Sequence, residues 1–193
     1  MISAVNALFN HPGLRSLLVK LRLPIAIAIA ALLVAWADPR WLWSALAVSM
    51  AGELIQLWCF ATLDKNASLA CRGPYALVRN PMYLGRFFIL GGALMLLGQP
   101  WLLAVFAVGY WFYMVNRVGR EERRLREVLG QPYADYCAGT NRFLPGAPYR
   151  GEPVLVWNWT LFGQNHGWQN FAGTAAFWIA AVVWILTRGS GAA

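Results

Sequence analysis

Five apolar runs, separated by polar connections, constrain the fold of this chain more than any other feature of its sequence. They cover residues 23–37, 41–63, 84–98, 101–116 and 171–187. Within a bilayer, backbone groups find no water, so spanning segments of this kind must be helical. The chain is 59% hydrophobic, whereas a soluble domain is closer to half apolar. We therefore predict an all-α, polytopic membrane protein with about five transmembrane helices, folded as a single domain over residues 1–193.

The third and fourth runs predict a helical hairpin that turns at Gln99-Pro100. Each arm has about fifteen residues, fewer than the ~20 that cross a hydrocarbon core of ~30 Å. Small residues let helices approach closely. Such residues are Gly85, Gly91, Gly92 and Gly98. We expect a tightly packed hairpin that thins the membrane locally, or one that lies against other helices.

The distribution of basic residues predicts the orientation. Of the sixteen Lys and Arg residues, only Arg40 and Arg188 fall outside the N-terminal segment, the region around 64–86 and the region 117–150. The positive-inside rule then puts the N-terminus and both regions in the cytoplasm. The formal net charge of +8 fits cytoplasmic loops, so we expect no nucleic-acid partner. We expect the inner or plasma membrane of a prokaryote, with the first run retained as a span and not cleaved as a signal peptide.

A polar segment before the third run is the first candidate site. It reads Gly73-Pro74-Tyr75-Ala76-Leu77-Val78-Arg79-Asn80-Pro81-Met82-Tyr83-Leu84-Gly85. Its prolines fix φ, and Pro81 disfavours helical backbone at Asn80, which we expect to be extended. Irregular backbone at a membrane helix is tolerated where it lines a cavity. The alternative is a turn that only caps a helix.

A charged stretch after the fourth run is the second candidate. Arg120-Glu121-Glu122-Arg123-Arg124-Leu125-Arg126-Glu127 predicts a cytoplasmic extension of the fourth helix over 117–129, ended by Gly130. Glu122 and Arg126 have the favourable i, i+4 order. A solvated helix is one interpretation. However, the apolar residues at 125, 128 and 129 indicate that one face is packed.

Taken in order, these residues resemble the isoprenylcysteine carboxyl methyltransferase family of integral membrane enzymes, which is related to the phospholipid N-methyltransferases. The family pattern is a glycine and an aromatic, Arg-His-Pro-x-Tyr-x-Gly, a helical hairpin, Glu-Glu with a leucine, Gly-x-x-Tyr-x-x-Tyr, and a terminal Arg with Pro. The matching residues here are Gly73, Tyr75, Arg79 to Gly85, Glu121-Glu122, Leu125, Gly130, Tyr133, Tyr136, Arg142 and Pro145. The resemblance covers about residues 70–146. It departs at Asn80, where the family usually has His, which leaves hydrogen bonding but no evident acid–base role.

The resemblance implies a methyltransferase that binds S-adenosylmethionine (SAM) at the cytoplasmic face, while a lipophilic acceptor enters from the bilayer. The implied catalytic residues are Arg79 and Glu122. The implied cofactor-binding residues are Tyr75, Val78, Asn80, Pro81, Tyr83, Glu121, Tyr133, Arg142 and Pro145. We expect no metal. Glu122 lies about 100° around the helix from Glu121, and we expect it to hold Arg126 or Arg79.

The acceptor is expected to be a lipophilic small molecule or a lipid-modified substrate. A carboxyl acceptor, such as an isoprenylcysteine or another isoprenoid or lipid acid, needs no general base. An amine acceptor, as in phospholipid N-methyltransferases, must lose a proton. Glu53, inside the second run, is either functional or a structural hydrogen-bond partner of a neighbouring helix. Two further functional classes compete with a methyltransferase: an NADPH-dependent membrane reductase and a non-catalytic membrane protein.

Residues 154–170 are rich in aromatics and predict an amphipathic turn or helix at the membrane surface, or alternatively the lining of a lipid entrance. His11 and His166 lie outside the motifs and are not assigned a role.

The orientation can be tested with a reporter fused after Pro145. Because basic residues concentrate on one side of the predicted spans, this fusion should report a cytoplasmic location. A matched fusion after Arg40 should report the opposite side. Periplasmic activity of the first fusion would overturn the predicted orientation.

Overall fold

The computed structural model describes residues 12–64 and 69–190, and its regular elements are helices. They are α2 (Pro12–Ala35), the 3-10 helix η1 (Pro39–Trp41), α3 (Leu42–Thr62), α4 (Pro74–Leu77), α5 (Pro81–Met95), α6 (Pro100–Leu129), α7 (Gln131–Gly139), the 3-10 helix η2 (Tyr149–Gly151), α8 (Trp159–Gln164) and α9 (Gly167–Ser190). The all-α prediction is therefore confirmed for the described residues. His11, to which the sequence assigned no role, lies outside them.

Among the described residues, three helical segments are long and apolar enough to cross a membrane: Pro39–Thr62, Pro100–Leu129 and Gly167–Arg188. They contain most of the predicted second, fourth and fifth spans. The predicted third span corresponds to α5, which is apolar but has only 15 residues. The predicted first span lies mostly within α2. The total of five spans stays a prediction.

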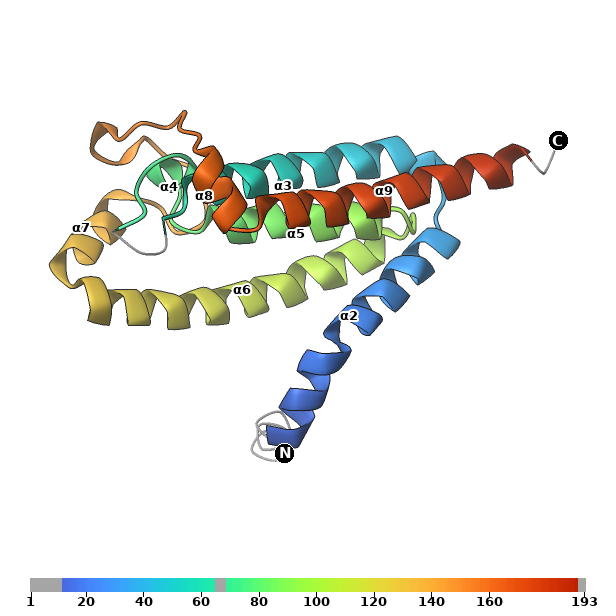
Figure 1. Cartoon of the computed structure of the whole chain (residues 1–193), viewed down its shortest axis with the longest axis horizontal. Coiled ribbons are helices and arrows are strands. Elements are labelled where there is room, and N and C mark those ends of the chain that lie inside the picture. Colours follow the sequence, from blue (N-terminus) through green and yellow to red (C-terminus); the bar gives the residue numbers. More distant parts are fainter. Residues whose placement is uncertain (1–11, 65–68, 191–193) are drawn as a thin grey trace.

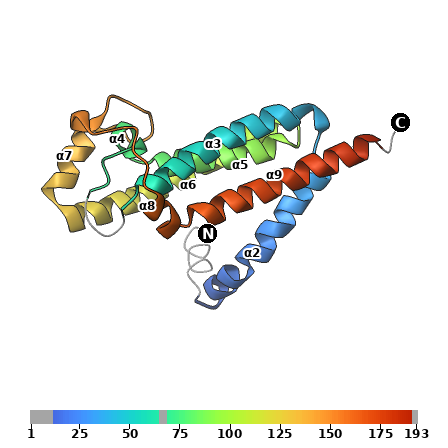
Figure 2. The same cartoon turned by 45° about the horizontal axis from the view of Figure 1, so that its top comes forward.

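Helix α3 is central to the bundle. It packs most extensively against α5 and also contacts α8 and α9 (Figures 1 and 2). Helix α6 lies along α5. Helix α2 contacts α9, and its N-terminal end points away from the bundle. The short helices α4, α7 and α8 gather at the end of the bundle where α3 ends and where α5 and α9 begin (Figure 1). The candidate motifs therefore lie at one end of the bundle.

Glycines bring α3 and α5 into close contact. A Cβ added to Gly52 would lie 2.5 Å from the carbonyl oxygen of Gly85. One added to Gly92 would lie 2.6 Å from the backbone nitrogen of Ser49. The closest glycine contacts of α5 are therefore with α3 and not with its hairpin partner. The expectation that the hairpin lies against another helix is met by α5, and local thinning of the membrane stays a prediction.

Buried polar groups connect α3 to α9. Glu53, which is 2% exposed, accepts hydrogen bonds from Asn170 Nδ2 (2.9 and 3.1 Å) and Thr174 Oγ1 (2.9 Å). Ser49 Oγ accepts a hydrogen bond from Trp178 Nε1 at 2.9 Å. Polar side chains of this kind hold helices together within membranes. The structural role considered for Glu53, a hydrogen bond to a neighbouring helix, is thus present.

Two local predictions have different outcomes. Helix α6 continues without a break from its apolar part to Leu129 and ends at Gly130 (φ 60°), as expected. Asn80 is not fully extended, because its φ is −128° but its ψ is only 52°. Its carbonyl accepts a hydrogen bond from the Tyr83 backbone N–H at 3.2 Å, so the chain already turns into α5 at this residue.

The glycine contacts predict the effect of one added methyl group. Gly92→Ala should lower the free energy of unfolding by about 1–3 kcal/mol, because the methyl group meets the α3 backbone. Gly109→Ala is the matched control, since its Cβ would meet nothing within 4 Å. The measurement is thermal or denaturant unfolding in detergent. Equal stability of the two variants would contradict the close packing.

Candidate active site

The candidate site is built from the segment before α5, the end of α6, and the chain that follows α7. Backbone hydrogen bonds hold the first and third segments together. The Arg79 N–H donates to the Asn141 carbonyl (2.9 Å), and the Gly146 N–H donates to the Leu77 carbonyl (2.9 Å). The Tyr136 hydroxyl donates to the Tyr75 carbonyl at 2.6 Å. The segment before α5 therefore lies beside α7 and the chain that follows it.

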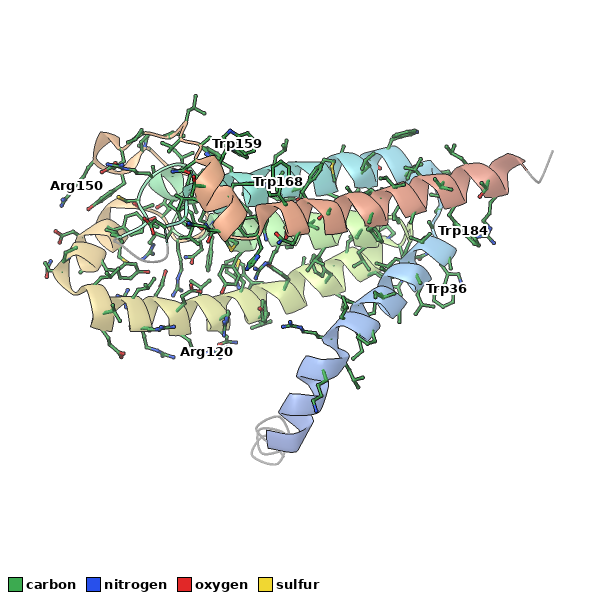
Figure 3. The ribbon with its side chains drawn as sticks, in the orientation of Figure 1. Trp36, Arg120, Arg150, Trp159, Trp168 and Trp184 are labelled. Atoms are coloured by element: carbon green, nitrogen blue, oxygen red, sulfur yellow. The ribbon has the colours of Figure 1, made fainter. Side chains whose placement is uncertain are left out.

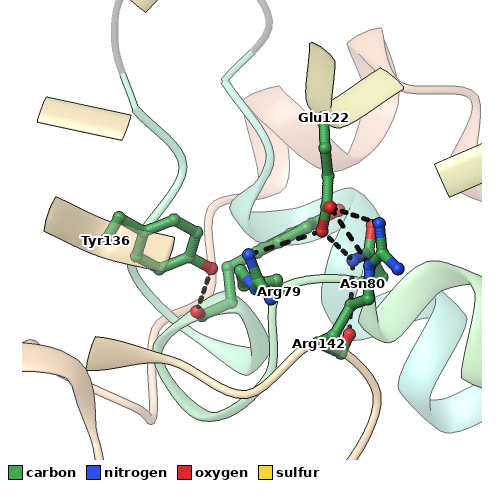
Figure 4. A network of polar contacts seen from close by, with 6 residues as sticks. Arg79, Asn80, Glu122, Tyr136 and Arg142 are labelled. Carbon is green, nitrogen blue, oxygen red and sulfur yellow. Dashed lines mark hydrogen bonds and ion pairs between the residues drawn. The ribbon is translucent and has the colours of Figure 1, made fainter. Parts of the chain in front are cut away.

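The Glu122 carboxylate is the centre of the polar network (Figure 4). Its Oε2 accepts hydrogen bonds from Arg142 Nη2 (2.6 Å) and Nε (3.1 Å). Its Oε1 lies 3.5 Å from Arg79 Nη1 and accepts a hydrogen bond from Asn80 Nδ2 at 3.4 Å. Asn80 Nδ2 also donates to the Arg142 carbonyl at 3.2 Å. One carboxylate therefore holds three predicted site residues.

Burial makes this network sensitive to the loss of any member. The Glu122 side chain is 4% exposed, that of Arg79 13%, and that of Arg142 35%. The hydrogen bond from Arg142 to the Glu122 carboxylate raises the pKa of the Arg142 guanidinium. Two guanidinium groups face one carboxylate, so the cluster has an excess of positive charge. Arg79 Nε is buried and has no hydrogen-bond partner among the described residues.

Four of the predicted cofactor-binding residues are buried in the protein: Tyr75, Val78, Pro81 and Tyr133. Tyr75 is 8%, Val78 3% and Tyr133 3% exposed. Burial raises the pKa of Tyr75 well above its usual value, so its hydroxyl stays neutral. Tyr133 packs with Tyr136 and Tyr149 in a hydrophobic cluster. In this structure these residues shape the loop at the site.

Glu121 has a different environment from Glu122. It is exposed, and its Oε2 accepts a hydrogen bond from the Tyr83 hydroxyl at 3.0 Å. The Tyr83 carbonyl accepts a hydrogen bond from the Tyr110 hydroxyl at 2.7 Å, which fixes the start of α5 against α6. Glu121 and Tyr83 therefore form a separate hydrogen-bonded pair with an exposed carboxylate. Pro81 is buried at the start of α5, and Pro145 is exposed after Arg142.

The partner of Glu122 was only partly predicted. Arg79 is a partner, and it is one of the two arginines that the sequence suggested. The shortest contact is with Arg142, which was predicted as a cofactor-binding residue and not as a partner of Glu122. The two residues are separated by the end of α6 and all of α7, so no helical spacing relates them. The positive charge of Arg142 was visible in the sequence, but its position was not.

The aromatic segment forms the helix α8 beside the end of α3. Trp159 and Trp168 stack with ring centroids 6.0 Å apart. Figure 3 labels both side chains, near α8 and the start of α9. The Asn158 N–H donates to the Ala61 carbonyl (3.0 Å), and Asn165 Nδ2 donates to the Leu63 carbonyl (2.6 Å). Asn165 thus binds a carbonyl at the end of α3, a role not predicted from the sequence. The predicted location of the segment at the membrane surface stays a prediction.

The network predicts a specific loss of stability. Glu122→Gln should destabilise the protein, because two guanidinium groups lose their counter-charge. The loss should not exceed the roughly 3–5 kcal/mol found for fully buried pairs, since Arg142 is partly exposed. Glu127→Gln, at an exposed position on the same helix, is the control. Unfolding in detergent measures both, and equal stability would show that the network contributes little.

Curated relatives resemble parts of this chain. Protein-S-isoprenylcysteine O-methyltransferase from Tribolium castaneum is 28% identical over 103 residues, which cover 47% of this chain and 37% of that protein. Protein-S-isoprenylcysteine O-methyltransferase B from Arabidopsis thaliana is 28% identical over 86 residues (45% and 42%). The cobalt-zinc-cadmium resistance protein CzcN from Cupriavidus metallidurans is 27% identical over 113 residues (57% and 52%).

These matches cover at most about half the length of each relative. No solved structure matches the chain. The sequence model of the phospholipid methyltransferase family matches residues 25–132, more than half of the chain. The matched region includes Arg79, Asn80, Glu121 and Glu122, which the structure brings to one end of the bundle. The chain therefore belongs to the phospholipid methyltransferase family.

Proposed function

We propose that this chain transfers the methyl group of SAM to a carboxylate on a lipophilic acceptor held in the membrane. The observation that carries the proposal is the convergence of Arg79, Asn80 and Arg142 on the buried Glu122 carboxylate, at the end of a bundle of apolar helices. The family takes its methyl group from SAM. A site in this place can meet a soluble cofactor and a membrane-bound acceptor together.

The residues present fit SAM. The Arg79–Arg142–Glu122 cluster has an excess positive charge and a buried, unpaired donor, Arg79 Nε, among the described residues. Both features suit the carboxylate of an amino-acid group, which guanidinium donors bind well. Glu121, exposed and oriented by Tyr83, suits ribose hydroxyls or an amino group. The resemblance likewise implies that Arg142, Glu121 and Tyr83 bind the cofactor, whereas it implies a catalytic role for Arg79.

The chemistry requires alignment more than acid–base catalysis. When bound, SAM supplies a methyl group on a positively charged sulfur. The chain must hold the acceptor atom in line with that methyl group and exclude water. We propose that the planar guanidinium of Arg79 orients a carboxylate, either that of the acceptor or that of SAM. Glu122 is then a positioning residue, because it fixes Arg79 and Arg142 and is itself only 4% exposed.

The excess positive charge favours a carboxylate acceptor, which is already ionised and loses no proton on methylation. An isoprenylcysteine carboxylate fits this description, and two of the relatives are named as isoprenylcysteine O-methyltransferases. A phospholipid amine is the second candidate, because the chain belongs to the phospholipid methyltransferase family. That reaction would require a proton acceptor, for which the exposed Glu121 is available.

The acceptor class can be tested with SAM labelled in its methyl group and protein purified in detergent. An S-farnesylcysteine with a blocked amine should gain a label that mild base releases, because a methyl ester forms. Its preformed methyl ester is the control and should gain none. Label on phosphatidylethanolamine alone would identify an N-methyltransferase. The absence of both transfer and SAM binding would overturn the proposal.

Arg79→Lys tests the role of the guanidinium, because it keeps the charge but loses the planar donor set. Turnover should fall at least tenfold, about 1.4 kcal/mol in the barrier. Arg120→Lys, at an exposed position on α6 that Figure 3 labels, should match the wild type. Equilibrium SAM binding, measured alongside, separates a role in orienting the acceptor from a role in holding SAM. Wild-type turnover in Arg79→Ala would exclude both roles.

A further inference from the structure

Two buried polar atoms on the segments that carry Arg79 and Arg142 have no hydrogen-bond partner among the described residues: Arg79 Nε and Thr140 Oγ1. A third such atom, Gln56 Oε1, lies on α3 within an apolar helix. Buried polar groups are nearly always paired in folded proteins, so an unpaired one requires an explanation. Two of them on adjoining segments indicate a common cause.

The two residues lie on segments that run side by side. Thr140 follows α7 in extended backbone (φ −133°, ψ 132°) and is 6% exposed. The carbonyl of the next residue, Asn141, accepts the hydrogen bond from the Arg79 N–H at 2.9 Å. The carbonyl of Arg142 accepts one from Asn80 Nδ2 at 3.2 Å. Residues 140–142 therefore lie alongside residues 79–80, joined by hydrogen bonds at two consecutive positions.

The chemistry of the two atoms defines the ligand. A guanidinium Nε–H donates only, and a threonine hydroxyl can donate to the same partner. The nearby charges are the guanidinium groups of Arg79 and Arg142 and the single Glu122 carboxylate, which leaves an excess of positive charge. Two donors in a positively charged, buried place suit an anionic oxygen.

We propose that Thr140 Oγ1 and Arg79 Nε together bind a carboxylate group of a ligand. Thr140 lies outside the region that the family model matches, and no sequence motif pointed to it. The inference rests on the proposed function and assigns it a further binding residue. The carboxylate belongs either to the amino-acid end of SAM or to the acceptor, and binding experiments distinguish these sources.

The first experiment measures equilibrium binding of S-adenosylhomocysteine, and of its analogue without the carboxylate, to the full chain in detergent. Thr140→Val should weaken binding of S-adenosylhomocysteine about tenfold or more and leave the analogue unchanged, because one hydrogen bond to a charged group is lost. Thr140→Ser keeps the hydroxyl and should retain binding. Thr160→Val, at an exposed position in α8, is the control for the same substitution elsewhere.

The second experiment covers the other source. If the acceptor supplies the carboxylate, Thr140→Val should weaken binding of the S-farnesylcysteine carboxylate and not of its methyl ester, while S-adenosylhomocysteine binds normally. Unchanged binding of both carboxylates in Thr140→Val would overturn the inference and assign the hydroxyl to a structural water. Unchanged binding of the carboxylate-free analogue shows that the variant is folded. If the proposed function itself fails, the wild type binds neither S-adenosylhomocysteine nor the analogue.

Discussion

The contact of one buried carboxylate with two guanidinium groups organises the polar end of this protein. Glu122 lies near the end of α6, whereas Arg79 and Arg142 come from the chain before α5 and after α7. A buried charge is costly without its partners, so the three groups hold one another in place. The carboxylate thus joins three segments that are far apart in the sequence. Without it, the two guanidinium groups would repel each other.

The helical bundle makes that contact possible. Glycines and buried polar groups fix α3 against α5 and α9, and the Tyr110 hydroxyl ties the start of α5 to α6. Helix α6 is a single helix of 30 residues, so its apolar part and its charged end form one continuous rod. The bundle therefore determines where Glu121 and Glu122 lie relative to the loop before α5.

Neighbouring glutamates on one helix have opposite environments. Glu122 faces the arginines and is buried, whereas Glu121 points about 100° away and stays exposed beside Tyr83. This separation supports a division of labour, in which Glu122 positions the arginines and Glu121 is free to meet a ligand. The proposed carboxylate-binding pair, Arg79 and Thr140, lies on the arginine side of this division.

The sequence by itself determined the helical class, the apolar segments and the motif residues. Hydrophobic runs, and the prolines and glycines that end helices, act on the chain locally. It also indicated that α6 continues to Gly130, because no proline interrupts the chain between Asn116 and Leu129. Only the tertiary structure decided that Glu122 pairs with Arg142, that Gly85 and Gly92 of α5 face α3, and that Thr140 Oγ1 is buried with no hydrogen-bond partner among the described residues. These features depend on which segments meet after the chain has turned at Gly130 and at Gln99-Pro100. The spacing of side chains along one helix does not indicate which distant segments will contact it.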